Sequence, residues 1–164
     1  MFDEFDYTGQ YNILCRRFET SLFPLLRSHN IQFAAYSPLA GGFLSGKPTF
    51  APSELEGTRF GEKAGVMNPY GIWYNKPSMH SAVRQLKEVC EPHGIGLPEV
   101  AIRWLVHHSA LRDGDGIIIG PGSAERLEEY VEHYKKEELP EDVVRVIEKV
   151  WEEIKEDAES IAQF

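Results

Sequence analysis

The sequence has few cysteines, no long apolar run and a deficit of positive charge. Only Cys15 and Cys90 occur among 164 residues, and they fit neither a CxxC pair nor a zinc-ligand spacing. We therefore expect two reduced thiols and no disulfide framework. No apolar run approaches the roughly 20 residues that span a bilayer, and the opening MFDEFDYTGQ is acidic where a secretory signal would be basic. The chain is predicted to be soluble, untargeted and cytoplasmic.

The shortage of positive charge excludes further classes of partner. Lysine and arginine number 17 against 26 aspartates and glutamates, a formal charge of −9 that repels nucleic acid phosphates and anionic lipid. Neither nucleic acid nor membrane is expected as a partner. The six histidines fall into no HExxH or other metal-ligand spacing, and no P-loop or nucleophile elbow occurs, so no metal site is predicted.

What is present is an alternation of strand and helix patterns. Short apolar runs at residues 31–37 and 116–120 are typical of buried strands, and a third strand is possible around residues 7–12. Such alternation favours a parallel α/β sheet. Two or three strands cannot cover their own edges, so the sequence predicts part of an α/β fold. Helical patterns occupy residues 16–28, 78–92, 97–108, 124–134 and 141–159.

One segment lacks any period. Residues 47–76 scatter proline, glycine, asparagine and charges, which is typical of a long loop. Loops of this length inside a compact domain are commonly functional lids or disordered. We therefore expect residues 1–164 to form a single domain that contains a long loop at 47–76.

Three stretches resemble the aldo-keto reductases, most closely the aflatoxin-aldehyde-reductase branch. They are GQYNILCRRFETSLFPLLR, FAAYSPLAGGFLSGK and IIIGPGSAERLEEY. In that family they match the end of the sixth barrel strand with its helix, the seventh strand with its cofactor loop, and the eighth strand with the turn that meets the adenosine phosphate. The resemblance implies a partial (β/α)8 TIM barrel, comprising the last two or three strands with their outer helices.

The second stretch has a physical reason to hold a dinucleotide. Glycines after a strand let the main chain approach a pyrophosphate and present its amides as donors, at the sheet edge where α/β barrels build their active sites. The resemblance implies that Tyr36 stacks on a nicotinamide ring while Ser37, Leu39 and Gly41 hold the phosphates. An ordinary glycine-rich turn beside a core tyrosine is the alternative.

The third stretch has the composition of an anion site. A helix start at Ser123 with Arg126 one turn in would gather amides, a hydroxyl and a guanidinium. This suits a 2′-phosphate and favours NADP over NAD. The resemblance implies that Gly120, Ser123, Arg126 and Glu129 line this pocket; a capped helix with a surface arginine is the alternative.

Arg59 is a further candidate, for substrate binding. It lies in Gly57-Thr58-Arg59-Phe60, which resembles a Gly-Arg-Phe element of the aflatoxin-aldehyde branch whose arginine can meet anionic substrates or cofactor. The alternative is a loop charge beside a phenylalanine that anchors the loop. Thr8 and Tyr130 depart from the family's usual Gln and Asn, so NADP(H) binding is expected to be weak.

No catalytic residue is predicted in this chain. The family's catalytic Asp, Tyr, Lys and His precede the region that matches Gly9, and hydride transfer to a carbonyl leaves an alkoxide that needs a proton donor. We expect an NADP(H)-dependent reductase of aldehydes or ketones that is inactive unless an N-terminal half completes it. Two other hypotheses stay open: a non-catalytic module that pairs with itself or with a complementary half-barrel, and a pocket with repurposed chemistry.

Overall fold

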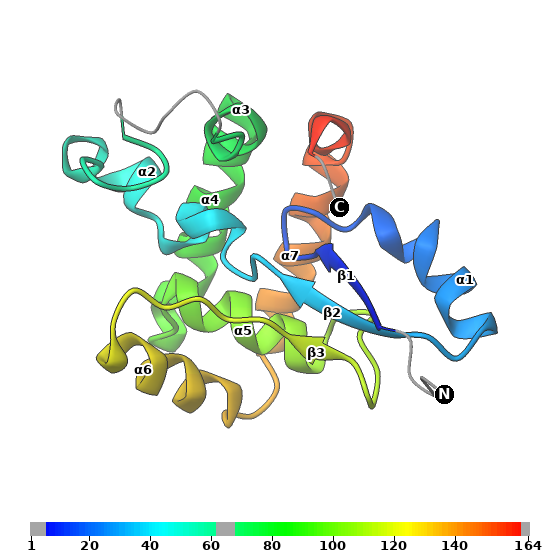
Figure 1. The fold of residues 1–164 in the computed structure, drawn as a ribbon. Helices are drawn as coiled ribbons and strands as arrows, with labels where there is room; N and C mark the ends of the chain where they lie inside the picture. The colour runs from blue at the N-terminus through cyan, green and yellow to red at the C-terminus, as the bar shows by residue number, and fades with distance from the viewer. Residues whose placement is uncertain (1–5, 62–67, 162–164) are drawn as a thin grey trace.

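A small parallel sheet lies at the centre of the structure, a computed structural model that describes residues 6–61 and 68–161. The strands β1 (Asp6–Gln10), β2 (Gln32–Tyr36) and β3 (Gly116–Ile117) follow each other in the order β1-β2-β3. Gln10 is paired with Tyr36, and Ala35 with Ile117. Because the strands are parallel, their carboxyl ends share one edge of the sheet (Figure 1).

The two faces of β2 differ in burial. Phe33 and Ala35 are buried, whereas Gln32, Ala34 and Tyr36 on the other face are only half-buried. The buried face packs on helices: the Phe33 ring lies 4.8 Å from that of Phe23. A strand covered on both faces would be buried throughout, so the sheet is packed on one face, as in a part of a barrel.

Helices supply most of the buried core. α4 packs along α7, and α5 packs on α6 (Figure 1). Their apolar residues repeat at helical spacing, which is why these segments are amphipathic helices. The main helices are α1 (Leu22–Ser28), α4 (Pro77–Cys90), α5 (Leu97–His107), α6 (Ala124–Tyr134) and α7 (Glu141–Ile154).

The sequence prediction of a mixed α/β fold with a small parallel sheet is confirmed, with shifts in element bounds. The pattern at 16–28 becomes a short turn η1 (Arg17–Glu19) and then α1, which puts Pro24 in the first turn, where a missing N–H costs little. β3 has two residues instead of the five predicted at 116–120. The pattern at 141–159 divides into α7 and a short turn η5 (Asp157–Ser160).

The segment predicted as a loop at 47–76 contains helical turns. These are α2 (Lys47–Phe50), η3 (Pro52–Glu54) and α3 (Tyr70–Tyr74), and the turn η2 (Ala40–Ser45) directly precedes them. Each is too short to show a period in the sequence, which is why a loop was expected. Residues 62–67 of this segment lie outside the described residues.

Among residues 6–61 and 68–161 no helix has the length and apolarity needed to cross a membrane. The same residues contain no cluster of three His, Cys, Asp or Glu that could hold a metal ion.

Candidate functional site

The turn after β2 has a strained main chain. Ser37, Ala40, Gly41 and Gly42 all have positive φ angles, at 54°, 52°, 68° and 103°. For Ser37 and Ala40 this left-handed region is uncommon, and such strain persists only where surrounding contacts enforce it. Inside the turn, the amide of Ala40 donates to the Ser37 carbonyl at 2.9 Å. The turn is therefore a fixed shape that follows directly from the last residue of β2.

Residues on neighbouring segments hold this turn. The Nδ2 of Asn12, beyond the end of β1, donates to the Ser37 carbonyl at 3.0 Å and to the Tyr74 hydroxyl at 3.2 Å. The hydroxyls of Tyr70 and Ser37 lie 2.8 Å apart. α3 therefore contacts both the turn and the segment that follows β1.

Tyr36, Ser37, Leu39 and Gly41 are thus placed together at the carboxyl end of β2. Tyr36, Ser37 and Gly41 are half-buried and Leu39 is buried. Burial, and next the neighbouring Tyr70, raise the pKa of the Tyr36 phenol. Their grouping follows from chain order; the proximity of Tyr70 was missed by sequence reasoning, because it comes from a segment 33 positions away.

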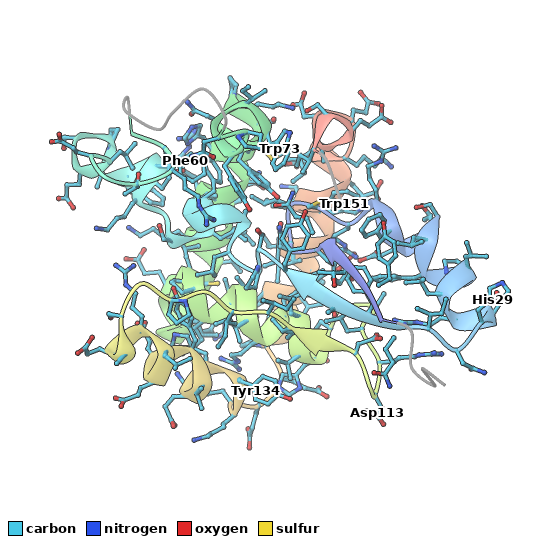
Figure 2. The ribbon with its side chains drawn as sticks, viewed as in Figure 1. His29, Phe60, Trp73, Asp113, Tyr134 and Trp151 are labelled. Carbon is cyan, nitrogen blue, oxygen red and sulfur yellow. The ribbon has the colours of Figure 1, made fainter. Side chains whose placement is uncertain are left out.

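Arg59 lies beside the same turn through Tyr70. Its guanidinium carbon is 4.8 Å from the centre of the Tyr70 ring, within the range of a cation–π contact. The ring of the next residue, Phe60, is 5.4 Å from the buried Phe43 of η2; Figure 2 labels Phe60 beside these turns. Phe60 therefore anchors the loop, as expected if Arg59 is only a loop charge. Arg59 itself is exposed.

The second candidate cluster follows β3. The Oγ of Ser123 accepts from the amide of Arg126 at 3.3 Å, so Ser123 caps α6 as predicted. The Nη1 of Arg126 lies 4.0 Å from where a β-carbon at Gly122 would stand, so the guanidinium reaches back to the helix start. Hydrogen bonds from its own amide and from Ser123 lower the pKa of Glu125. The Glu125 carboxylate thus already accepts from the donors at the start of α6.

The other members of this cluster are also placed by the structure. Gly120, Ser123, Arg126 and Glu129 are all exposed. Glu129 lies 3.3 Å from the Nε2 of His133, one turn further along α6. The two clusters leave the same sheet edge from neighbouring parallel strands (Figure 1), and a ligand that spans both would have to extend across the ends of β2 and β3.

Two buried tyrosines are unsuited to proton donation. Tyr11 and Tyr74 are fully buried, and burial raises the pKa of each phenol. The Tyr11 hydroxyl donates to Glu19 at 2.7 Å and accepts from the Ala110 amide at 2.9 Å. Neither side chain reaches a surface where a substrate could lie, so both are structural.

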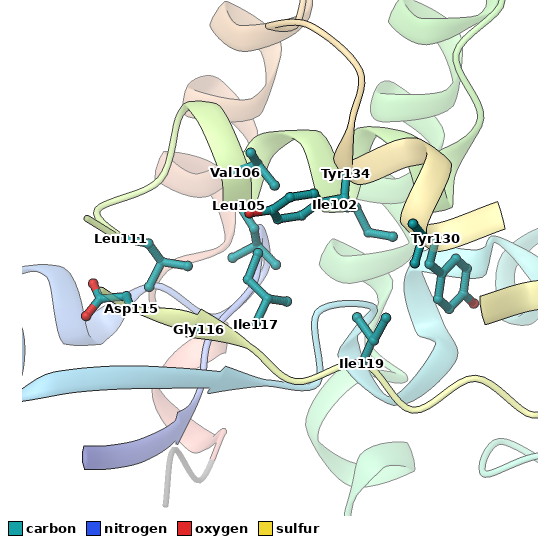
Figure 3. A pocket seen from close by; sticks show the side chains of 11 residues that line it. Ile102, Leu105, Val106, Leu111, Asp115, Gly116, Ile117, Ile119, Tyr130 and Tyr134 are labelled. Carbon is teal, nitrogen blue, oxygen red and sulfur yellow. The ribbon is translucent and has the colours of Figure 1, made fainter. Parts of the chain in front are cut away.

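An apolar groove lies beside the second cluster, between α5, β3 and α6. Its volume is about 370 Å³, and Figure 3 shows Leu105 and Ile117 pointing toward each other in it while Tyr130 and Tyr134 approach from α6. Val131 and Tyr134 are 39% and 58% exposed. The spacing of Leu127, Val131 and Tyr134 on one helix face is the signal that could have revealed this surface. The other lining residues are Ile102, Val106, Leu111, Asp115, Gly116 and Ile119.

Over most of its length the chain is similar to proteins that are named as reductases or oxidoreductases. Residues 5–152 match the model of the aldo/keto reductase family. The chain is 37% identical to an aldo-keto reductase of Pseudocercospora fijiensis over 155 residues, which are 91% of this chain and 51% of that protein. It is 39% identical to the oxidoreductase sirO of Leptosphaeria maculans over 157 residues, 93% of this chain and 46% of the relative.

A human protein extends the comparison. The chain is 33% identical to human aflatoxin B1 aldehyde reductase member 2 over 154 residues, 88% of this chain and 42% of that protein. The chain therefore spans about half the length of the curated relatives that it matches.

Proposed function

Because the chain belongs to the aldo/keto reductase family, we propose that it forms the NADP(H)-holding side of a reductase of aldehydes or ketones. The human relative is named for an aldehyde substrate, and a small carbonyl compound is the corresponding substrate class here. The proposal concerns this chain joined to the part of the relatives that it does not cover.

One observation carries the proposal. The turns at 37–42 and 120–126 follow neighbouring parallel strands and leave the same sheet edge, where α/β barrels place their ligands. NADP(H) carries phosphate at two places, the pyrophosphate and the 2′-position of the adenosine, and two adjacent turns are suited to hold one each. Tyr36, Ser37, Leu39 and Gly41 would contact the nicotinamide and pyrophosphate half.

The second turn would hold the adenosine phosphate. Arg126 supplies a cation at the start of α6, where the helix dipole and capping donors already favour an anion. A 2′-phosphate would replace the Glu125 carboxylate near Ser123. Gly120 and Glu129 would border the adenosine. Because a guanidinium pairs with a phosphate by charge-assisted hydrogen bonds, the site should prefer NADP to NAD.

The chain's own residues would bind and orient rather than transfer protons. When bound, the cofactor supplies a hydride to the carbonyl carbon, and the resulting alkoxide then needs a proton. Tyr11 and Tyr74 are buried and do not fit that role. We assign no catalytic residue to this chain and expect weak NADP(H) binding without carbonyl reduction when the chain is assayed alone.

Titration calorimetry with NADP⁺, NAD⁺ and 2′,5′-ADP tests the cofactor proposal. Wild-type chain should bind NADP⁺ more tightly than NAD⁺. The variant Arg126→Ala should lose roughly 10- to 100-fold in NADP⁺ affinity, as expected for a charge-assisted contact of ~1.5–3 kcal/mol, with little change for NAD⁺. Arg112→Ala, at another exposed arginine, is the control. Equal affinities of both variants for NADP⁺ would remove the assignment of Arg126.

The apolar groove favours a second candidate function, binding of a complementary half-barrel. Its exposed Val131 and Tyr134 form an apolar surface, and such surfaces commonly mark interfaces. The stretch of the relatives outside this chain's match is about as long as the chain itself, which makes a half-barrel the fitting occupant. The net charge of −9 opposes pairing of two copies.

Light scattering with a separately produced complementary half of a relative tests this second candidate. The mixture should give a one-to-one complex, and Val131→Glu should abolish it, since a charge would be buried in an apolar contact. Glu128→Gln, on the same helix and exposed, should leave the complex intact. A homodimer of the chain alone, or no complex with wild type, would argue against a half-barrel as the occupant.

A further inference from the structure

Tyr70, the first residue of α3, lies directly on the turn assigned to the pyrophosphate. Its hydroxyl is 2.8 Å from the Oγ of Ser37. Its ring fills the space beside Gly41: a β-carbon built at Gly41 would stand 2.1 Å from Cδ1 of Tyr70, far inside van der Waals contact. Only a glycine at position 41 therefore leaves room for the Tyr70 ring.

Several contacts keep the Tyr70 ring in this position. The Arg59 guanidinium carbon lies 4.8 Å from its centre, and the ring of Trp73 lies 5.4 Å away at a steep angle; Figure 2 labels Trp73 on α3. The main-chain amide of Tyr70 donates to Oδ1 of Asn68 at 3.2 Å. One turn later, the buried Tyr74 accepts from Asn12. The helix that begins with Tyr70 is thus tied at its other end to the same asparagine that fixes Ser37.

Tyr70 occupies part of the space that a phosphate on Ser37 and Gly41 would need. A phosphate oxygen bonded to the Ser37 hydroxyl would stand about 2.5–3.0 Å from Oγ, the distance at which the Tyr70 hydroxyl now lies. The ring fills the side of Gly41 where a β-carbon would stand, so a pyrophosphate can approach the main chain from that side only if the ring moves.

We infer that the Tyr70 side chain is a gate on the pyrophosphate site, closed in this structure and displaced when a dinucleotide binds. The inference rests on the proposed cofactor function. Rotation of the ring would expose Ser37 and Gly41 together. It would also release the Arg59 guanidinium from the ring face, which places a cation beside the phosphates. Tyr70 is only half-buried, so the ring can leave without opening the core.

The test compares NADP⁺ with 2′,5′-ADP, which lacks the pyrophosphate and nicotinamide. For Tyr70→Ala, calorimetry should show NADP⁺ affinity about tenfold higher than in wild type, ~1.4 kcal/mol, because no ring has to be displaced. Affinity for 2′,5′-ADP should not change. The matched control is Ile72→Ala, which removes a large side chain that is 74% exposed on the same helix and should leave both affinities unaltered.

Each other outcome is decisive. If 2′,5′-ADP binds and Tyr70→Ala leaves the NADP⁺ affinity unchanged or lowers it, the gate is refuted and the cofactor proposal stands. If 2′,5′-ADP and NADP⁺ bind to neither wild type nor variant, the cofactor proposal and the gate fail together. Should Tyr70→Ala not fold, Tyr70→Phe decides: it keeps the ring, loses the bond to Ser37, and should tighten NADP⁺ about twofold.

Discussion

The side-chain amide of Asn12 donates a hydrogen bond to the main-chain carbonyl of Ser37, over 3.0 Å, and so joins the end of β1 to the turn after β2. Ser37 has a φ angle of 54°, which a serine seldom adopts without support. The Oδ1 of the same Asn12 accepts from the amide of Leu14 at 2.9 Å. The buried Asn12 side chain therefore fixes the segment after β1 to the turn after β2, which belongs to the candidate site.

Replacing Asn12 by leucine should destabilise the fold. Leucine has similar size but leaves the Ser37 carbonyl and the Leu14 amide without this partner, and an unsatisfied buried group costs roughly 1–3 kcal/mol. Urea denaturation should show that loss in the free energy of unfolding. Asn75→Leu, at an exposed asparagine whose bond to His80 water can replace, is the control, with a change within about 0.5 kcal/mol. Equal stability of the two variants would mean that Asn12 does not fix Ser37.

Replacing Arg16 by lysine should lower the stability of the fold. Its guanidinium lies 5.0 Å from the centre of the Trp104 ring and 5.6 Å from that of Trp151, a tryptophan of α7 labelled in Figure 2. It also bonds to Glu19 and Glu148. A lysine can neither stack as a plane nor bond in this forked geometry.

We expect Arg16→Lys to cost about 1–3 kcal/mol and to lower the melting temperature by roughly 2–4 °C for each kcal/mol. Differential scanning calorimetry measures this. The neighbouring Arg17 is exposed and bonds to the Glu159 carbonyl, so Arg17→Lys should melt close to wild type. A melting temperature for Arg16→Lys equal to the Arg17→Lys value would contradict the structural role.

His108 should make stability depend on pH. Its Nε2 accepts from the amide of Leu139 at 2.9 Å, which requires the neutral ring. Burial lowers its pKa from 6.5; His107 and Arg103 act in the same direction, while Glu138 and Glu148 oppose it. The unfolded chain therefore binds the proton first as pH falls, so this contribution is full above about pH 6.5 and is lost toward the lower folded-state pKa.

The measurement is unfolding free energy at pH 7.5 and pH 5.5, roughly one pH unit either side of the ordinary histidine pKa. Wild type should lose more stability on acidification than His108→Gln, whose amide does not titrate. His80 also has a lowered pKa, so His108→Gln should keep part of the dependence and a variant with both histidines replaced should keep less. An identical pH response in wild type and His108→Gln would exclude the His108 contribution.

Much of the fold could be predicted because its signals are local. The apolar positions of α4 and α7 repeat at helical spacing, and Ser123 has both the residue type and the position of a cap. β2 was correctly placed from its apolar run. β3 was overestimated because Ile118 and Ile119 are as apolar as strand residues, yet Ile118 is 48% exposed, and beyond Ile117 the pairing continues only with the bond from the Ile118 amide to the Ala35 carbonyl at 2.8 Å.

The site was predictable only in part, because its remaining contacts are not local. The sequence predicted residues 37–42 as one cofactor loop, but the residue types do not indicate that Ser37 and Ala40 have positive φ angles. α3 has five residues, too few for a helical period. Its contacts with Ser37 and Asn12 join positions 33 and 62 residues apart, so tertiary packing decided what covers the turn.

Substitutions at the adjacent Gly41 and Gly42 can distinguish two destabilising effects: overlap with the Tyr70 ring and strain of the left-handed backbone. Gly41 and Gly42 both have positive φ, but a β-carbon at Gly42 would meet nothing within 4 Å, whereas one at Gly41 would overlap the Tyr70 ring. Alanine at either position should cost about 1–2 kcal/mol for the left-handed backbone. Gly41→Ala should cost a further ~1–3 kcal/mol for the overlap.

A double-mutant cycle isolates that overlap. In a Tyr70→Ala background the excess cost of Gly41→Ala over Gly42→Ala should largely vanish, which gives a coupling energy of at least ~1 kcal/mol between positions 41 and 70. Gly42→Ala should show no coupling to Tyr70→Ala, because no side chain approaches that position. If the two glycines respond alike in both backgrounds, Tyr70 does not rest on Gly41 in solution. The ring would then leave the turn open, and a dinucleotide would have nothing to displace.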